Sequence, residues 1–478
     1  MYFKYLFEGR LRQLLTYIYP ETLIAGLIMA VPLFVDKNRH FLIVYLLLFF
    51  VFYFVVGKLT NTIWYTFLAI VPFGVGRYFE YDVISMSLWG GEKNLGFSTP
   101  LLFSDILLLF MVYLLIKRWW KRKNSFHLST KYYSAYIWLI LFLIVAGFSV
   151  FTSSFQITST FYFLQLTKMI TLFLVAREVF LDKSLLKKSI QILLLFVALN
   201  SVLIIIQFVN NGPLGLKVED LSALYGWYAD ENPGLYRPGG LYSDPNIAGT
   251  LIASFYPIFL LGTLFSKKIK DISSWLVLTL ISVALILTGS RSSWLIAFMI
   301  SFISIRIFSK KYKIHIPDII KKYKVAIIII LLIIFGPLII NRLSTLVDAL
   351  SQQGGGTYRL EQIKVSWQYF TNRPFGTGIG TYPYAMISDY PFNKYGFIPT
   401  YPHNIFAQIS AETGIFGIIF FVLFIANLFR VKYITLKKKD VYKGSLLLAG
   451  LSILLLSSLF PWVLHPKMAP FFWILLAI

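Results

Sequence analysis

Long apolar runs recur along the whole chain, and they constrain the fold more than any other feature of the sequence. A helix needs about 20 apolar residues to cross the hydrocarbon core of a bilayer. Several runs are shorter than this, so the sequence predicts an all-α integral membrane protein with about 12–14 transmembrane helices. The runs lie near residues 22–35, 41–57, 62–75, 101–116, 133–151, 160–176, 189–209, 246–265, 273–288, 293–308, 325–341, 403–429, 444–462 and 467–478.

Composition supports this class and limits the chemistry. Of the 478 residues, 58% are hydrophobic and only 14% are charged, which is typical of a membrane protein. The first apolar run is followed by many others, so we expect no cleaved signal peptide. The chain has no Cys, which excludes disulfides, thiolate metal sites and a Cys nucleophile. Any chemistry must come from His, Arg, Lys and carboxylates.

The positions of Lys and Arg predict the orientation in the membrane. With a cytoplasmic N-terminus, the most basic loops all face the cytoplasm, as the positive-inside rule requires. The net charge of +23 then follows from topology and does not indicate a nucleic-acid partner. The basic loops are 117–131, 177–188, 267–270, 306–324 and 430–443.

This orientation places two long hydrophilic loops, 210–245 and 342–402, outside the cytoplasm, together with a smaller loop at 76–100. The chain is otherwise a single multi-span domain. The loop at 342–402 combines an amphipathic segment, 357–369, with a Gly-rich run, 374–380. Its aromatic content favours a functional loop over a disordered one. No strand precedes the Gly-rich run and no βαβ pattern surrounds it, so we interpret it as a turn and not as a nucleotide loop.

The end of the first long loop carries Arg237 and the sequence Asp244-Pro245-Asn246. Asp suits the N-cap of a helix and Pro its first turn, so a structural role accounts for Asp244 and Asn246. Capping does not need Arg237. A guanidinium group beside helix N-termini makes a site for phosphate.

Two further arginines have an open interpretation. Arg291 lies in a tight turn, 288–293, between two short apolar runs, and either reaches the membrane interface or binds an anion. Arg359 lies in the amphipathic segment, which is typical of a helix on the membrane surface and needs no ligand. The apolar face of this segment consists of Leu360, Ile363, Trp367 and Phe370.

His403 and Asn404 begin the next apolar run, and Gly414 and Gly417 follow within it. The two glycines are three residues apart, so we expect them on one helical face, where they permit close helix packing. A His at a helix start either caps the helix or takes part in chemistry, and the sequence alone leaves both possibilities open.

Three other ionisable residues raise alternatives. Lys168 lies in the middle of its apolar run, and a cation there is costly unless it is paired or hydrated, so we expect it to face protein or a ligand route. Glu80 and Asp82 lie in the smaller loop and have the chemistry to hold a divalent metal against a diphosphate. Loop solvation is the commoner reason for such acids.

Taken in order, these motifs resemble the O-antigen ligase and polymerase superfamily over about residues 160–430. The motifs are Arg237 with Asp244-Pro245-Asn246, then Gly289-Ser290-Arg291, Arg359 ahead of Pro374 to Gly380, and His403-Asn404 ahead of Gly414 and Gly417.

The resemblance implies a GT-C-like, inverting glycosyltransferase in the bacterial cytoplasmic (inner) membrane, with no metal or other cofactor. Its substrates would be an undecaprenyl-diphosphate-linked glycan donor and a glycan or lipid-linked acceptor, so its partners are membrane lipids and glycans. His403 would activate the acceptor while Arg237 and Arg291 engage the diphosphate. The substrate-binding candidates are Arg359, Asp244, Asn246, Asn404 and Lys168.

Among the activities of this superfamily we favour polymerisation of a surface polysaccharide, with ligation to lipid A core as the alternative. A polysaccharide flippase would have a similar number of spans. The chain shows no internal repeat, and a flippase has little need of two large outer loops.

Overall fold

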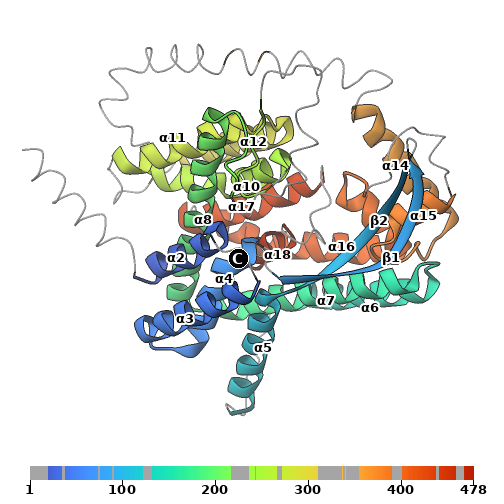
Figure 1. The fold of residues 1–478 in the computed structure, drawn as a ribbon, viewed down its shortest axis with the longest axis horizontal. Coiled ribbons are helices and arrows are strands. Elements are labelled where there is room, and N and C mark those ends of the chain that lie inside the picture. The colour runs from blue at the N-terminus through green and yellow to red at the C-terminus, as the bar shows by residue number, and fades with distance from the viewer. Residues whose placement is uncertain are drawn as a thin grey trace, which may run out of the picture.

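A computed structural model describes residues 20–34, 38–73, 76–88, 91–121, 132–216, 236–242, 244–265, 272–310, 336, 340, 355–389, 401–437, 441–458 and 468–478 (Figure 1). Most of the predicted run 325–341 lies outside these residues, as do parts of both long loops, 217–235, 342–354 and 390–400.

Each of the other predicted apolar runs coincides with a helix. The helices are α2 (Pro20–Phe34), α3 (Asn38–Val56), α4 (Leu59–Ile70) with a 3-10 turn (Val71–Phe73), α5 (Phe103–Lys121), α6 (Tyr133–Thr152), α7 (Gln156–Val179), α8 (Lys183–Val209), α10 (Pro245–Phe265), α11 (Ile272–Leu287), α12 (Arg291–Phe308), α16 (Ile405–Lys437), α17 (Val441–Ser457) and α18 (Ala469–Ala477). The second long loop adds α14 (Gly355–Asn372) and α15 (Tyr382–Asp389).

The helices have the length and composition of a membrane protein. Within the described residues, six helices are long and apolar enough to cross a bilayer, namely α6, α7, α8, α10, α12 and the Ile405–Tyr433 part of α16. Shorter apolar helices accompany them, among them parts of α2, α3 and α11. Large apolar side chains such as Phe54 and Phe298 are exposed, as expected for residues that face lipid. The prediction of a helical, multi-pass membrane protein is confirmed.

The C-terminal helix α18 lies near the middle of the molecule, between α7 and α17 (Figure 1). Its side chains from Ala469 to Ala477 are buried. Nine residues span only about 14 Å, so α18 crosses half a bilayer at most. Arg177 Nη1 donates to the Ala477 carbonyl at 2.9 Å and Lys432 Nζ to the Leu476 carbonyl at 2.6 Å. Cations there complement the negative end of the helix dipole.

The smaller loop forms an antiparallel hairpin of β1 (Gly76–Leu88) and β2 (Gly91–Leu102), in addition to the predicted helices. The register pairs Gly76 with Leu102 and Leu88 with Gly91. Glu80 pairs with Ser98, whereas Asp82 lies in an irregular stretch between Tyr81 and Ile84. The sequence analysis expected only a loop here.

Helix α16 is interrupted at Gly414, which has φ 69° and ψ −163°. The expectation that Gly414 and Gly417 share one face of a regular helix is therefore wrong. Gly414 allows a loop, and not another helix, to approach closely. A Cβ on Gly414 would lie 2.0 Å from the Pro374 carbonyl oxygen. The break separates a short half-helix, 405–413, from the long half that follows.

The Gly-rich run 374–380 binds at this break and is a turn, as predicted. The Thr377 N–H donates to the Ala411 carbonyl at 2.9 Å, and the Gly378 N–H to the Glu412 carbonyl at 3.0 Å. The Ile415 N–H donates to the Pro374 carbonyl at 3.0 Å. These bonds satisfy backbone groups that a helix break would otherwise leave without partners.

The other side of the turn packs against the corner between α6 and α7. The Ile379 N–H donates to Ser149 Oγ at 3.1 Å. A Cβ on Gly378 would lie 2.4 Å from Ser153 Oγ, and one on Gly380 would lie 2.0 Å from Tyr162. Both glycines have positive φ, a backbone conformation that other residues rarely adopt.

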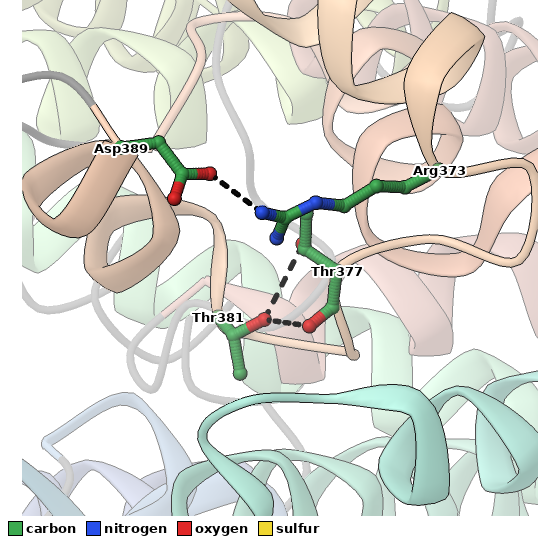
Figure 2. Close-up of polar contacts among 4 residues, drawn as sticks. All are labelled: Arg373, Thr377, Thr381 and Asp389. Atoms are coloured by element: carbon green, nitrogen blue, oxygen red, sulfur yellow. Dashed lines mark hydrogen bonds and ion pairs between the residues drawn. The ribbon is translucent and has the colours of Figure 1, made fainter.

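Polar contacts also connect the residues on the two sides of the turn, as Figure 2 shows. Arg373 Nη2 pairs with Asp389 Oδ2 at 2.8 Å, which links the end of α14 to the end of α15. The Thr381 hydroxyl donates to the Thr377 carbonyl at 2.9 Å. The turn therefore joins α14, α15 and the short half of α16.

Replacing Gly376 with Ala should destabilise the protein by more than about 3 kcal/mol, because backbone strain and a backbone clash add. Gly376 has φ +84°, and a Cβ there would lie 2.2 Å from the Glu412 carbonyl oxygen. The measurement is unfolding of the purified protein in detergent.

Two matched variants separate the effect of backbone strain from the effect of the clash. Gly57 also has positive φ (+69°) but nothing within 4 Å of a Cβ, so Gly57→Ala should cost only about 1 kcal/mol. Gly262 has open space and lies inside α10, so Gly262→Ala should stabilise the protein by up to about 1 kcal/mol, because Ala has the higher helix propensity. Equal stability of Gly376→Ala and Gly57→Ala would contradict tight packing of the turn.

Candidate functional site

The expected site residues, apart from Lys168, lie at or near the starts of four helices or in the loop before one of them. Arg237 and Asp244 precede α10, Arg291 is the first residue of α12, Arg359 lies early in α14, and His403 precedes α16. Helix N-termini carry partial positive charge and unpaired N–H groups. Such an arrangement favours an anionic ligand.

The start of α10 has the cap that the sequence predicts. Asp244 Oδ1 accepts a hydrogen bond from the Asn246 N–H at 2.7 Å. Asn246 Oδ1 in turn accepts from Arg237 Nη2 at 3.3 Å. Arg237 Nε donates to the Thr288 carbonyl at 3.2 Å, so this arginine links the start of α10 to the turn between α11 and α12.

Two buried amides of α8 hold the loop that carries Arg237. Gln207 Nε2 donates to the Gly240 carbonyl at 2.8 Å, and the Gly240 N–H donates to Gln207 Oε1 at 2.7 Å. Asn200 Oδ1 accepts from the Leu241 N–H at 2.8 Å. Neither residue is among the sequence-based predictions. Three amide side chains, those of Gln191, Asn200 and Gln207, interrupt the apolar run 189–209 and were the available signal, because buried amides require partners.

The start of α12 combines a cation with an open helix end. Ser290 takes the N-cap position with extended backbone but makes no side-chain capping bond within the described part of the chain. Arg291 Nη1 is buried and has no hydrogen-bond partner among the described residues. Gly249 of α10 permits this close packing, because a Cβ there would lie 2.9 Å from Ser293 Oγ.

Helix α14 confirms the predicted amphipathic segment and is slightly longer. Leu360, Ile363 and Trp367 are exposed, whereas Val365 and Tyr369 are buried. The position of this helix on the membrane surface stays a prediction.

Arg359 of α14 lies within electrostatic reach of both preceding helix starts. The Arg359 side chain is exposed, and its partial desolvation lowers the pKa of Arg359; the positive charge of Arg291 lowers it further, whereas Asp244 opposes the shift. Two nearby positive charges of this kind favour an anion between them.

His403 follows Pro402 and is half-buried at the start of α16. Burial lowers the pKa of His403 to about 4, and the charge of Arg359 adds to this effect. The imidazole is therefore neutral near pH 7 and able to accept a proton. Asn404 caps the helix, since its Oδ1 accepts from the Phe406 N–H at 2.9 Å and the Ala407 N–H at 3.0 Å.

Lys168 faces protein, which is one of the two positions expected for it. Its Nζ pairs with Asp105 Oδ2 at 3.0 Å, and Asp105 also accepts from the Leu102 N–H at 3.0 Å. The partner lies on α5, which carries none of the other candidates. A role for Lys168 in substrate binding stays a prediction.

The site thus brings together three guanidinium groups, one carboxylate and a neutral imidazole. Guanidinium groups beside a neutral imidazole have the chemistry to bind an anion next to a proton acceptor. Among the residues that the structure describes, no three His, Asp or Glu side chains lie close enough to hold a metal ion. The side chains of Glu80 and Asp82 lie outside this description, so the expected metal independence stays a prediction.

Comparison with known proteins gives one family match. Residues 276–422 match the family model described as O-antigen ligase. No curated protein matches the chain. The matched stretch contains Arg291, Arg359 and His403, whereas Arg237 and Asp244 precede it. The match covers less than half of the chain, and it supports similarity of this stretch to the O-antigen ligase and polymerase superfamily.

Proposed function

We propose that the protein is an inverting, metal-independent glycosyltransferase that moves a glycan from undecaprenyl diphosphate to a hydroxyl group of an acceptor sugar. The family match supports ligase or polymerase activity in general. One observation carries the more specific proposal. The buried Arg291 Nη1 without a described partner lies at the uncapped start of α12, and Arg359 links this position electrostatically to His403.

The donor diphosphate fits the cationic part of the site. A diphosphate diester carries one negative charge on each phosphate, and guanidinium groups bind such oxygens with paired, charge-assisted hydrogen bonds. The first N–H groups of α12 supply further donors. Arg237, Arg291 and Arg359 then stabilise the negative charge that develops on the leaving diphosphate.

His403 serves the acceptor. Its neutral imidazole removes the proton from the acceptor hydroxyl as the oxygen attacks the anomeric carbon of the donor sugar. A new carbon–oxygen bond forms while the bond from that carbon to the phosphate oxygen breaks, and the diphosphate leaves with the electron pair. Attack on the side opposite the leaving group inverts the anomeric centre.

The location follows from the basic loops. With the N-terminus in the cytoplasm, the starts of α10, α12 and α16 face outward from the bacterial inner membrane. The acceptor then approaches from the aqueous side and the lipid donor from the bilayer. We favour a growing glycan as acceptor, with lipid A core as the alternative. Glycan transfer by purified protein, with a lipid-linked donor and each acceptor in turn, tests the activity and also excludes a flippase.

His403→Ala should lower the turnover number by about 100- to 10,000-fold, the usual contribution of a positioned general base. Donor binding should change little, because the arginines remain. Transfer assays with purified protein measure turnover, and Ser410→Ala is the control. Ser410 lies on the same half-helix, where its hydroxyl donates to the Ala407 carbonyl at 2.9 Å. Parental turnover in His403→Ala would remove His403 from the mechanism.

The pH dependence of the parent gives a second readout for His403. The lowered pKa of about 4 leaves the imidazole neutral above this pH. The ratio kcat/KM, which reports the free enzyme, should therefore be flat from about pH 5 to 8 and fall only near pH 4. A midpoint near 6.5 that disappears in His403→Ala would show that the imidazole is not buried beside Arg359.

Arg291→Ala should slow transfer by about 100- to 1,000-fold and also weaken donor binding, since it removes a buried donor aimed at developing charge. Arg291→Lys should restore little activity, because one ammonium group cannot make the paired contacts of a guanidinium. Donor titrations with the purified variants separate binding from turnover. Full activity of Arg291→Lys would indicate that a point charge is sufficient.

A further inference from the structure

Asp244 caps α10 and also lies within electrostatic reach of two arginines of the site. Its Oδ1 accepts from the Asn246 N–H at 2.7 Å, and Asn246 holds Arg237 through its side chain at 3.3 Å. The same carboxylate interacts electrostatically with Arg237 and with Arg359. It therefore places a negative charge inside a site built for an anion.

This negative charge does not increase the affinity of the site for a phosphate. It attracts the same arginines that the donor needs, and it repels the donor. Burial raises the pKa of Asp244, and the hydrogen bond from the Asn246 N–H and the charge of Arg237 oppose this shift because both stabilise the carboxylate. A cap alone does not require the charge, because Asn is as good an N-cap as Asp.

The charge has a different effect on donor and product. The donor is a diphosphate diester. After transfer, the lipid diphosphate has a free terminal phosphate, whose second ionisation lies near pH 6. The product is therefore more negative than the donor, and a purely cationic site would hold it more tightly. Release of the product would then limit turnover.

We infer that Asp244 is the internal counter-ion of the arginines and that its charge weakens binding of the diphosphate product enough for release. This inference rests on the proposed function and adds to it a residue that controls release. Asp244 acts through Arg237 and Arg359 and keeps its role as the cap of α10.

The variant Asp244→Asn isolates the charge, because it preserves the N-cap. Asp182 supplies a matched control. It caps α8, where Oδ1 accepts from the Ser184 N–H at 2.8 Å and the Leu185 N–H at 3.3 Å, and it belongs to none of the site contacts described above. Asp182→Asn removes the same charge from the same type of position.

Binding of inorganic diphosphate to the purified full chain, measured by calorimetry, tests the inference. Asp244→Asn should bind this probe about tenfold more tightly than the parent, with the difference reduced in high salt. Its turnover number should fall, and added diphosphate should inhibit it at lower concentration. Asp182→Asn should behave as the parent does. If Asp244→Asn does not fold, Asp244→Ser keeps a capping hydroxyl and should show the same tightening.

Failure of the inference and failure of the proposed function give different results. One combination of results overturns the inference alone: the parent binds diphosphate, Arg291→Ala binds it more weakly, and Asp244→Asn binds it with the same affinity as the parent. Asp244 then does not control release. Equal tightening in Asp182→Asn also overturns the inference. If the parent does not bind diphosphate and Arg291→Ala has no effect on transfer, the proposed diphosphate site is wrong, and the inference falls with it.

Discussion

The break in α16 at Gly414, and the turn that binds to it, determine where the candidate chemical groups lie. A broken helix leaves carbonyl and N–H groups without helical partners, and such groups are costly when buried. The turn supplies partners through Pro374, Thr377 and Gly378. These contacts fix the half-helix that follows His403 to the loop that follows α14. Arg359 lies on α14. One set of backbone contacts thus connects the start of α16, where His403 lies, with the end of the helix that carries Arg359.

A buried carboxyl group reinforces this connection. Glu412 is fully buried just before the break. It accepts hydrogen bonds from Gln408 Nε2 at 3.2 Å and from the Tyr382 N–H at 3.3 Å. A buried carboxyl group without partners would be strongly destabilising. The two contacts therefore favour a single arrangement of the half-helix and α15.

The sequence predicts the membrane helices well because their cause is local. Length and apolar composition decide whether a segment spans a bilayer, and Asp244-Pro245 marks a helix start through the chemistry of these two residues alone. The break at Gly414 has no such signal, since its cause is the distant turn. The contacts of Gln207 with Gly240 and of Lys168 with Asp105 are equally non-local. The motifs identify the candidate residues, whereas tertiary structure decides their partners.

The electrostatics of the site are arranged before any substrate binds. Arg291 and Arg359 repel each other, and Asp244 offsets part of this repulsion. An anionic leaving group gains from groups that are already fixed, because they need no reorganisation during the reaction. Burial lowers the pKa of His403, and the charge of Arg359 adds to this effect. The proposed donor site and the proposed base thus share Arg359 as a neighbour.

A structure of the protein with undecaprenyl diphosphate, determined by electron cryo-microscopy, tests the central claim most directly. The account predicts phosphate density within hydrogen-bond distance of Arg291 and the first N–H groups of α12, with Arg359 on the same ligand and His403 facing the position of the sugar. Phosphate density away from the start of α12, with His403 remote from the ligand, would contradict it.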